Sequence, residues 1–449
     1  MSEYAKYEGK TWGELTETDR EFLLRDVFVN DLRTGAVIDN GYGMIHFCET
    51  LVAVGNVKDG RVILPDDAEL YNPCIGEGGR PIPQEELDAE FEAWKAEQEM
   101  SNNEYDEIEL LFKQRPHVVI LGAGASVAAI LNGDKNGQKI SAMAGFVDKL
   151  GMRDIIDGCN LTTTSDNLED IYMEMYDRPE CDDARKELEN RIEDYFLSFE
   201  IPDEPTAYDF LLLGLTSKDL VATFNWDPLL LQAYNRCSAI TQNLPELAFL
   251  HGNVGIGLCE KDKVAGPIWS KCSKCGGKFE KIPLLYPVKN KDYSSNRFIA
   301  DSWNLLKHYL KKAYRVTIFG YSAPKSDVAA IGMLKQAWGD WTERKLEEIE
   351  MIDVADEDKL HDSWQDFIHT HHYSVHRDIF SSAIGSFPRR TCEALFDNKM
   401  AVRWLDGRGK GFKPDMSFDD IEKLIRPLLK NELDNDGKTS LMDPYVARG

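Results

Sequence analysis

Short apolar runs alternate with longer stretches of helical periodicity through the middle of the chain. From Pro116 onward the helical patterns cover residues 146–152, residues 168–176 and the acidic stretch that follows them. This alternation predicts an α/β domain with a mostly parallel sheet, because parallel strands need long crossover connections that are usually helical. The runs expected to form the strands are HVVILG (117–122), DLVATFN (219–225), LAFLHG (247–252), VTIFGYS (316–322) and EEIEMIDV (347–354).

The N-terminal part of the chain has a different pattern. It predicts a short helix over 16–28 and strands within 43–55 and 61–65, separated by turn signals. An acidic helix is expected over 83–100. A run of charges on a helix is usually a solvated face, so we interpret this helix as solvent-exposed rather than as a docking surface. The residues on its less polar side are Leu87, Phe91, Trp94 and Gln98.

These differences predict three regions. Residues 1–112 are expected to form an α+β region, residues 113–356 the α/β domain, and residues 357–449 a mainly helical region with a helix over 418–433. A chain of 449 residues is long enough for two or three domains.

Charge and cysteine content narrow the range of functions. The formal net charge is −26 at pH 7, which argues against direct binding to nucleic acid or to an anionic membrane surface. The sequence shows neither an apolar run near the length of a membrane span nor a charged-then-apolar leader. The nine cysteines are scattered and odd in number, so we expect a protein of the reducing cytoplasm.

The first predicted strand runs into a glycine-rich turn, VVILGAGASVAAI (118–130). A strand that ends in Gly-x-Gly before a helix lets the backbone approach a pyrophosphate, which then faces the helix N-terminus. The third glycine of the dinucleotide fingerprint is missing, because Val127 stands in its place, so a simple tight turn is the alternative. Ser126 adds a hydroxyl that either caps the helix or holds a phosphate.

Polar residues follow the other predicted strands. Asn225 and Asp227 end one strand, and a cap on a helix beginning at Pro228 explains Asp227 better than it explains Asn225. His251 follows the next strand, and Gly320 with its neighbours follows the fourth. A lone histidine is more often structural than catalytic, but ligands bind at the carboxyl ends of strands in open α/β sheets. The four strand ends together therefore indicate a binding site.

These stretches together resemble the sirtuin-like family over roughly residues 116–356. The resemblance implies a Rossmann-like, mostly parallel core that binds NAD, with α+β flanking regions. It places the family's glycine turn at Gly122-Ala123-Gly124-Ala125-Ser126, its asparagine strand end at Thr223-Phe224-Asn225-Trp226-Asp227, its histidine-glycine pair at His251-Gly252, its later glycine-serine turn at Gly320-Tyr321-Ser322, and a last strand tip at Asp353. The NAD-binding residues it implies are Gly122, Ala123, Gly124, Ser126, Thr223, Asp227, Gly320, Ser322 and Asp353.

The chemistry of that family is cleavage of the bond between nicotinamide and ribose in NAD. The bond breaks through an oxocarbenium-like transition state, which needs dipoles near the developing positive charge and an oriented nucleophile. The resemblance implies that Asn225 holds the nicotinamide ribose and positions an attacking water. It assigns His251 as the general base for a ribose hydroxyl or for that water.

Two departures from the family indicate a branch within it. Protein deacylases of the family carry a Phe-Gly-Glu segment after the zinc module, whereas this chain reads GKFEKIPLLYPVKNKDYSS (277–295). Trp226 stands where deacylases usually have isoleucine or tyrosine. The chain thus looks more like the sirtuin-like NAD hydrolases of bacterial anti-phage defence, which consume NAD when a partner or an assembled state signals infection.

The alternatives are an NAD-dependent protein deacylase and a non-catalytic module that senses NAD or ADP-ribose. The presence of both Asn225 and His251 argues against the sensing module. About 200 residues lie outside the resembling core and contain no recognisable sensor domain. We therefore expect activation by homo-oligomerisation or by a separately encoded partner, for example an ATPase.

Three cysteines after His251 suggest a metal site within an insertion over about 256–282. Cys272 and Cys275 form a Cys-x-x-Cys-Gly-Gly knuckle, and Cys259 with Asp262 lies upstream. These four residues are the predicted ligands of a structural zinc, although thiolate and imidazole ligands are commoner than an aspartate. Three reduced cysteines in a loop are the alternative.

Five of the nine histidines gather late in the chain. No carboxylate or cysteine sits at obvious ligand spacing from them, and a helix would turn their rings to different faces. We interpret them as non-catalytic. They are His361, His369, His371, His372 and His376.

Overall fold

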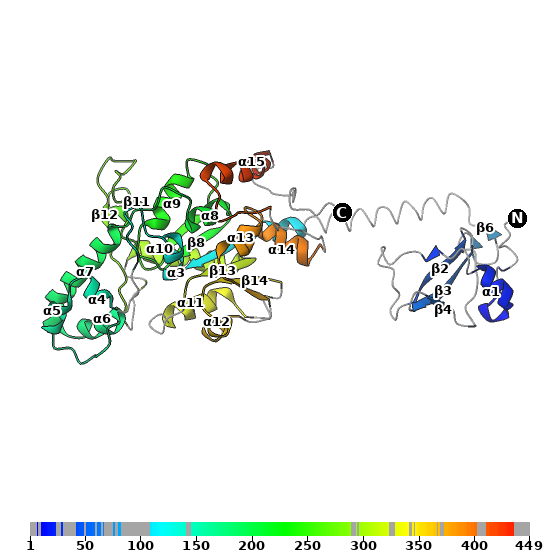
Figure 1. Ribbon diagram of the computed structural model, residues 1–449. Coiled ribbons are helices and arrows are strands. Elements are labelled where there is room, and N and C mark those ends of the chain that lie inside the picture. The colour runs from blue at the N-terminus through cyan, green and yellow to red at the C-terminus, as the bar shows by residue number, and fades with distance from the viewer. Residues whose placement is uncertain are drawn as a thin grey trace. The chain divides into compact units, whose positions relative to one another are not determined.

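The computed structural model divides the chain into two compact units, Met1–Tyr105 and Asp106–Gly449 (Figure 1). None of the helices in its described part is long and apolar enough to cross a bilayer. The described residues are 7, 10–23, 28–29, 42–48, 51–58, 61–63, 66, 75–76, 80–81, 108–140, 145–288, 293, 296–322, 328–340, 344, 346–365, 367–368, 372–401 and 410–434.

The first unit contains a four-stranded antiparallel sheet. Its strands pair in the order β1-β2-β3-β4, and the predicted strand region 43–55 forms two of them, which pair with each other. The predicted acidic helix over 83–100 lies outside the described residues. The elements of this unit are η2 (Trp12–Glu14), α1 (Glu17–Leu23), β1 (Phe28–Val29), β2 (Tyr42–Cys48), β3 (Leu51–Lys58), β4 (Arg61–Ile63), and the pair β5 (Ile75–Gly76) and β6 (Arg80–Pro81).

The second unit is built on a six-stranded parallel sheet, which confirms the predicted α/β fold. The strands lie in the order β15-β14-β13-β7-β8-β9. Numbered by their place in the chain, this is the doubly wound order 3-2-1-4-5-6, whose direction reverses between the first strand, β7, and the fourth, β13. The strands are β7 (His117–Leu121), β8 (Leu220–Thr223), β9 (Glu246–Phe249), β13 (Arg315–Phe319), β14 (Glu348–Ile352) and β15 (Tyr373–His376).

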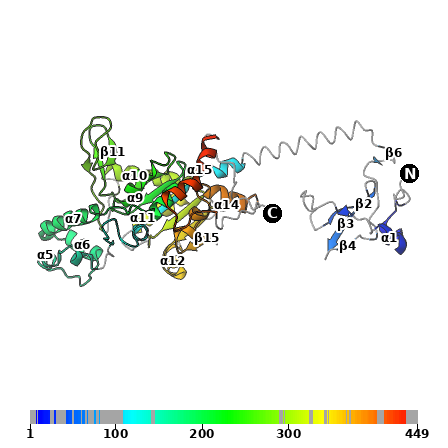
Figure 2. The same cartoon turned by 45° about the horizontal axis from the view of Figure 1, so that its top comes forward.

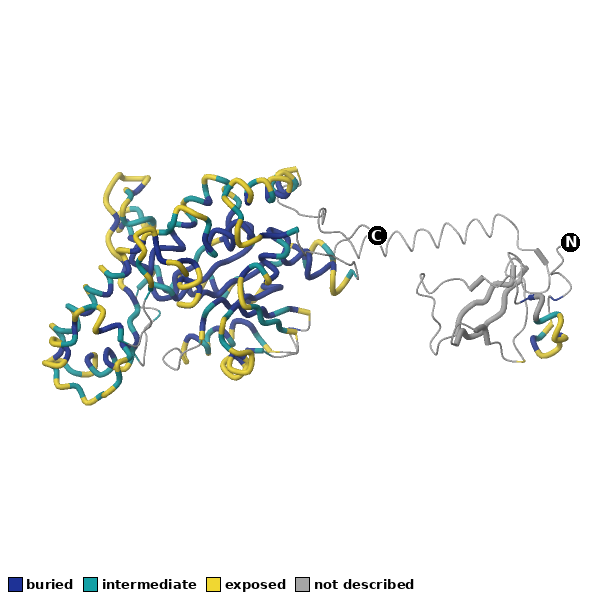
Figure 3. The backbone as a smooth tube through the Cα atoms, viewed as in Figure 1, coloured by how far each residue is buried: buried dark blue, intermediate teal, exposed yellow. Residues whose placement is uncertain are grey.

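Helices cover both faces of this sheet (Figures 1 and 2). Successive strand residues point to opposite faces, so Val118 and Ile120 join one apolar cluster while Val119 and Leu121 join the other. Both clusters are buried, and exposed segments lie at the periphery (Figure 3). The first cluster packs against α10 (Arg297–Lys312), α11 (Val328–Trp338) and α12 (Glu357–Trp364); the second packs against α3 (Ala123–Ala129), α8 (Ala207–Leu213), α9 (Leu229–Cys237) and α13 (Ala383–Ser386).

Two insertions interrupt the alternation of strands and helices. A helical insertion separates β7 from β8, and its first helix ends before Gly151, whose φ of +65° does not continue a helix. A small antiparallel sheet separates β9 from β13, within the predicted insertion over 256–282. The elements are α4 (Phe146–Lys149), α5 (Arg153–Asp157), α6 (Leu168–Tyr176), η4 (Pro179–Cys181) and α7 (Asp182–Leu197), then β10 (Ile256–Cys259), β11 (Val264–Pro267) and β12 (Glu280–Lys281).

The C-terminal helices belong to the second unit, and the sheet includes β15, which follows residue 356. The remaining elements are η6 (Ile379–Ser381), α14 (Thr391–Lys399) and α15 (Phe418–Asp434), the last of which corresponds to the helix predicted over 418–433. The domain limits predicted at 112/113 and 356/357 stay predictions.

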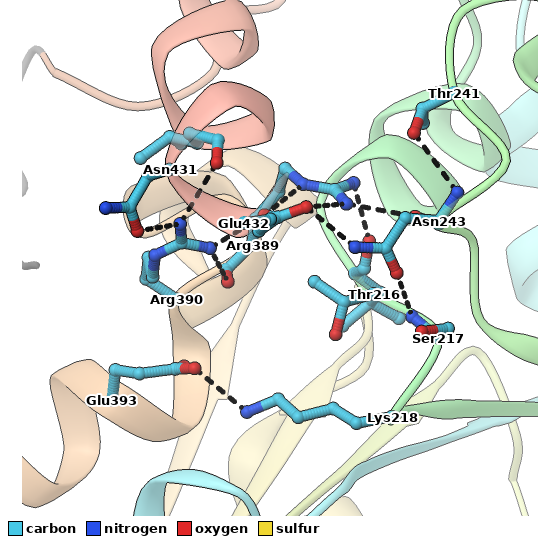
Figure 4. A network of polar contacts seen from close by, with 12 residues as sticks. Thr216, Ser217, Lys218, Thr241, Asn243, Arg389, Arg390, Glu393, Asn431 and Glu432 are labelled. Atoms are coloured by element: carbon cyan, nitrogen blue, oxygen red, sulfur yellow. Dashed lines mark hydrogen bonds and ion pairs between the residues drawn. The ribbon is translucent and has the colours of Figure 1, made fainter. Parts of the chain in front are cut away.

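A buried network of ion pairs and hydrogen bonds connects α15 to the rest of the sheet domain (Figure 4). Glu432 accepts two hydrogen bonds from Arg389, at 2.7 and 2.6 Å, and one from Arg390 at 2.8 Å. Asn243, in the loop before β9, donates to the same carboxylate at 2.7 Å. Glu432 of α15 therefore binds two arginines and the loop before β9. This loop lies at the amino end of its strand, whereas Asn225 lies at a carboxyl end.

Candidate functional site

The turns that follow β7 and β13 pack directly against each other. Gly122 N donates to Phe319 O at 3.0 Å, and Gly124 N donates to Gly320 O at 2.9 Å. A Cβ on Gly122 would lie 2.5 Å from Gly320 O, and a Cβ on Gly320, whose φ is +61°, would lie 2.3 Å from Ala125 N. The glycines are thus required by contact between two turns, a reason that the sequence motif alone does not reveal.

A cavity of about 520 Å³ lies where these turns meet the carboxyl ends of β8, β9 and β14. It is the crevice expected at the reversal of strand order. Of the predicted NAD-binding and catalytic residues, those that line it are Gly122, Ala123, Gly124, Ser126, Asn225, Asp227, His251, Gly320, Ser322 and Asp353. Thr223 does not line it; this residue is buried in β8, and its Oγ1 accepts a 3.0 Å hydrogen bond from Asn225 N.

The Asn225 side chain is held by its amide nitrogen. Nδ2 donates to Gly122 O at 2.7 Å and to Ser126 Oγ at 2.9 Å. A backbone carbonyl only accepts, so the Gly122 contact fixes which end of the amide carries the nitrogen. Oδ1 is therefore the end that a ligand in the cavity can use.

A buried polar cluster of Ser126, Tyr208 and Asp227 holds the Asn225 side chain in place. Ser126 Oγ donates to Asp227 Oδ2 at 2.6 Å and lies 2.7 Å from Tyr208 OH. Burial raises the pKa of Tyr208, which keeps the phenol protonated as a donor to Ser126. Burial also raises the pKa of Asp227. Ser126 is therefore engaged in this cluster and does not cap α3, whose N-terminus has no side-chain cap.

Asp227 also binds the start of α9. Its Oδ1 accepts from Leu229 N at 3.1 Å, and α9 begins at Leu229, with Pro228 as its N-cap rather than its first residue. Asn253 donates to Asp227 O at 2.6 Å and thereby holds the loop between Asn225 and α9. The loop that carries Asn225 is thus fixed on both sides.

His251 reaches the cavity from the end of β9. It is 6% exposed, and its ring packs edge-on against Phe224 with 4.8 Å between ring centroids. Its backbone oxygen accepts from Leu285 N at 2.9 Å. The imidazole is thereby placed on the same cavity wall as Leu285 and Phe224, beside the loop of Asn225.

The helical insertion supplies a wall that the sequence did not predict. Asn167, Leu168 and Glu169 from the start of α6, and Phe196 from α7, line the cavity. Trp226 lines it beside them and packs edge-on against Phe196 at 5.7 Å between centroids. The N-cap signal of Asn167, whose side chain accepts from Glu169 N, predicts a helix start but gives no indication of the cavity.

The described lining of this cavity contains acidic residues but no basic ones. Among its described lining residues the carboxyl-bearing ones are Glu169, Asp227 and Asp353, and neither lysine nor arginine is present. Such a lining favours a cationic part of a ligand, or a positive charge that develops during a reaction.

The predicted metal ligands lie together in the β10–β12 insertion. The donor atoms of Cys259, Asp262, Cys272 and Cys275 are all within 4.8 Å of one another. The Sγ atoms of Cys259 and Cys275 are 3.6 Å apart, and Cys272 Sγ is 3.2 Å from Asp262 Oδ2. Zn–S bonds of about 2.3 Å in a tetrahedron place sulfurs about 3.8 Å apart. The four residues thus fit a tetrahedral metal.

The late histidines that the structure describes do not form a comparable group. His361 lies on α12 and His376 on β15, whereas His369 and His371 lie outside the described residues. His372 directly precedes β15. Within the described part of the chain, none of these histidines lines the cavity at the strand ends or belongs to a group of three or more metal-ligand side chains.

Comparisons with known proteins give likeness to solved structures only. No protein-family profile matches the sequence. No curated protein matches it. The chain is similar to a structure of Sir2 bound to acetylated peptide, with 12% identity, TM-score 0.30, and coverage of 66% of this chain and 98% of that chain.

Two further solved structures are similar over comparable lengths. A Sir2 complex with a p53 peptide and NAD+ has 13% identity, TM-score 0.31 and coverage of 66% and 98%. A structure described as the structural basis of sirtuin substrate affinity has 15% identity, TM-score 0.34 and coverage of 64% and 98%. The function is therefore inferred from the cavity itself.

Proposed function

We propose that this protein is an NAD glycohydrolase that cleaves NAD to nicotinamide and ADP-ribose. One observation carries the proposal: the cavity at the reversal of a doubly wound sheet is lined by both Asn225 and His251. Dinucleotides bind at such a reversal. The amide and the imidazole are the two groups that the resemblance assigns to the reaction.

The proposed reaction uses water as the nucleophile. The C1′–N bond breaks with its electron pair passing to the nicotinamide ring nitrogen, which neutralises the cationic ring. A water oxygen bonds to C1′, and its proton is released by way of a general base. Asn225 Oδ1 would orient the ribose and the water, and His251 would serve as the base for the water or a ribose hydroxyl. The carboxyl-bearing lining would stabilise the oxocarbenium-like charge.

Two features of this chain support hydrolysis rather than deacylation in this proposal. Trp226 packs between Phe196 and Tyr286, with centroid distances of 5.7 and 5.4 Å. The Phe-Gly-Glu segment of protein deacylases is missing from the sequence after the cysteine knuckle. We therefore propose water, rather than an acylated lysine, as the group that accepts ADP-ribose.

Purified full-length protein incubated with NAD, with and without an acetylated peptide, tests this proposal. We expect nicotinamide and ADP-ribose to form at the same rate in both reactions. Nicotinamide that forms only with the peptide, together with O-acetyl-ADP-ribose, would show a deacylase. NAD binding without any turnover under activating conditions would show a sensing module.

We propose that the activity is conditional and belongs to an anti-phage defence system. An NAD hydrolase that is always active would drain the central redox carrier of its own cell. We expect purified protein to cleave NAD weakly at low concentration, with specific activity that rises as it assembles or as a partner, for example an ATPase, is added. Specific activity measured across a dilution series, with mass determined in parallel, checks this. Full turnover by a dilute monomer would contradict it.

We propose that the knuckle holds one structural zinc through Cys259, Asp262, Cys272 and Cys275. The metal would cross-link β10 to the loop before β12. It would thereby stabilise the β10–β12 insertion, which follows His251 in the chain. Elemental analysis is expected to find about one zinc per chain, lost when Cys272 and Cys275 are replaced by serine. The loss is expected to lower thermal stability more than the rate constant of the chemical step. A metal-free native protein that is well folded would contradict the assignment.

A further inference from the structure

Among the described residues that line the cavity at the strand ends, three carry carboxyl groups, and their surroundings differ. Asp227 uses both oxygens within the protein, one for a serine hydroxyl and one for the start of α9. Asp353 follows β14, which lies three strand positions from β8 in the sheet, or about 14 Å at the usual spacing of neighbouring strands. It is therefore distant from the Asn225 loop that follows β8. The third carboxyl group belongs to Glu169, in the helical insertion.

Aromatic contacts place Glu169 on the side of the cavity where Asn225 lies. Tyr172 is about one turn further along α6 than Glu169, so the two residues share a face of this helix. Tyr172 stacks on Tyr286 with 5.0 Å between ring centroids, and Tyr286 packs against Trp226 at 5.4 Å. Trp226 directly follows Asn225 in the chain. Two ring contacts thus connect the start of α6 to the loop that carries Asn225.

The carboxylate of Glu169 is available to a ligand. Its backbone N donates to Asn167 Oδ1 at 2.8 Å. Within the described part of the chain, the carboxylate takes part in neither a hydrogen bond nor an ion pair. The described lining contains no lysine or arginine that could neutralise it. Such a half-buried carboxylate accepts hydrogen bonds from neutral N–H donors and repels another carboxylate.

The lining beside Glu169 suits a flat ring. Leu168, Phe196 and Trp226 also line the cavity, and the rings of Phe196 and Trp226 pack edge-on at 5.7 Å between centroids. A pocket of this kind holds an aromatic ligand by apolar contact and orients it with a few polar groups. The polar group on a nicotinamide ring is a carboxamide, whose NH₂ is a hydrogen-bond donor.

We propose that Glu169 accepts a hydrogen bond from the carboxamide of nicotinamide and thereby selects NAD over its nicotinic acid analogue, which carries a carboxylate in that position. The inference rests on the proposed function, because that function places the nicotinamide ring beside Asn225 and His251. The carboxamide donates to Glu169. The nicotinate carboxylate instead meets a charge of the same sign and has no lysine or arginine to bind in the described lining.

Calorimetric titration of full-length protein with NAD, the nicotinic acid analogue of NAD and ADP-ribose tests the proposal. His251→Ala serves as the background, so that turnover does not consume NAD during the titration. We expect NAD to bind about tenfold or more tightly than the acid analogue, because a charge-assisted hydrogen bond is replaced by repulsion between like charges.

Glu169→Gln in the same background is expected to weaken NAD binding about fivefold and to narrow the preference for NAD. The glutamine amide is a weaker acceptor than a carboxylate, but it can also donate to the carboxylate of the acid analogue. ADP-ribose lacks the ring, so its affinity should stay unchanged. Glu180→Gln is the matched control, because Glu180 is exposed in the same insertion and outside the described lining, and it should change none of the three affinities.

The proposal is overturned if the acid analogue binds as tightly as NAD, or if Glu169→Gln leaves the preference for NAD unchanged. An equal loss of affinity for all three ligands would show a structural role and would also overturn it. Protein that binds none of the three would reject the NAD site itself, and this inference with it. All of these outcomes concern binding, so they are distinct from a failure of NAD cleavage, which the nicotinamide assay detects.

Discussion

Replacing His251 with alanine is expected to lower kcat for NAD cleavage by about two to four orders of magnitude. The imidazole is packed against Phe224 in the cavity wall. In the proposed reaction it takes a proton from water or from a ribose hydroxyl, and alanine cannot do so. Nicotinamide release followed by chromatography under activating conditions gives the rate. His361→Ala is the matched control, because His361 is on the exposed side of α12 and outside the cavity.

Asn225→Ala is expected to lower kcat to a similar degree. It removes Oδ1 from the cavity, and it also removes the Nδ2 bonds to Gly122 and Ser126. The second loss is expected to lower the free energy of unfolding by about 1–3 kcal/mol, so thermal unfolding has to be measured beside the rate.

Full activity in a folded His251→Ala protein would refute the proposed mechanism.

Glu432→Ala is expected to lower the free energy of unfolding by about 3–5 kcal/mol. Arg389 and Arg390 are 1% and 0% exposed, and the substitution would leave both guanidinium groups buried without their carboxylate. Denaturant unfolding followed by circular dichroism measures the change. Glu422→Ala on the same helix is the control, since its pair with Arg426 is exposed and contributes little.

The same carboxylate makes the anchor sensitive to acid. Burial opposes ionisation of Glu432, but hydrogen bonds from Arg389 and the charges of both arginines lower its pKa below the ordinary value of 4.5. A lowered pKa in the folded state gives stability that is present above that ordinary value and is lost as the pH falls through the folded pKa.

Equal stabilities of Glu432→Ala and the native protein at neutral pH would show that α15 is held by its apolar face alone.

The order of apolar runs along the chain was enough to predict a parallel α/β core, as the six-stranded sheet confirms. It also predicted that Asn225, His251 and Gly320 lie close together. Parallel strands share one carboxyl edge, so residues just after successive strands converge whatever their separation in sequence. Hydrophobic periodicity and the long helical connections between apolar runs are local properties of the chain, and the sequence therefore determined them.

Only the tertiary structure decided which partners these elements take. It placed β13 beside β7, so that Gly122 and Gly320 are glycines because their turns touch. It brought Glu169 and Phe196 of the helical insertion to the cavity, and Tyr208 into contact with Ser126. It also packed α15 against the domain, where Glu432 binds Arg389 and Arg390. Hydrophobic periodicity records that a face is buried but not which distant surface buries it. Such contacts are set by the packing of the whole domain, and one sequence carries no local signal of them.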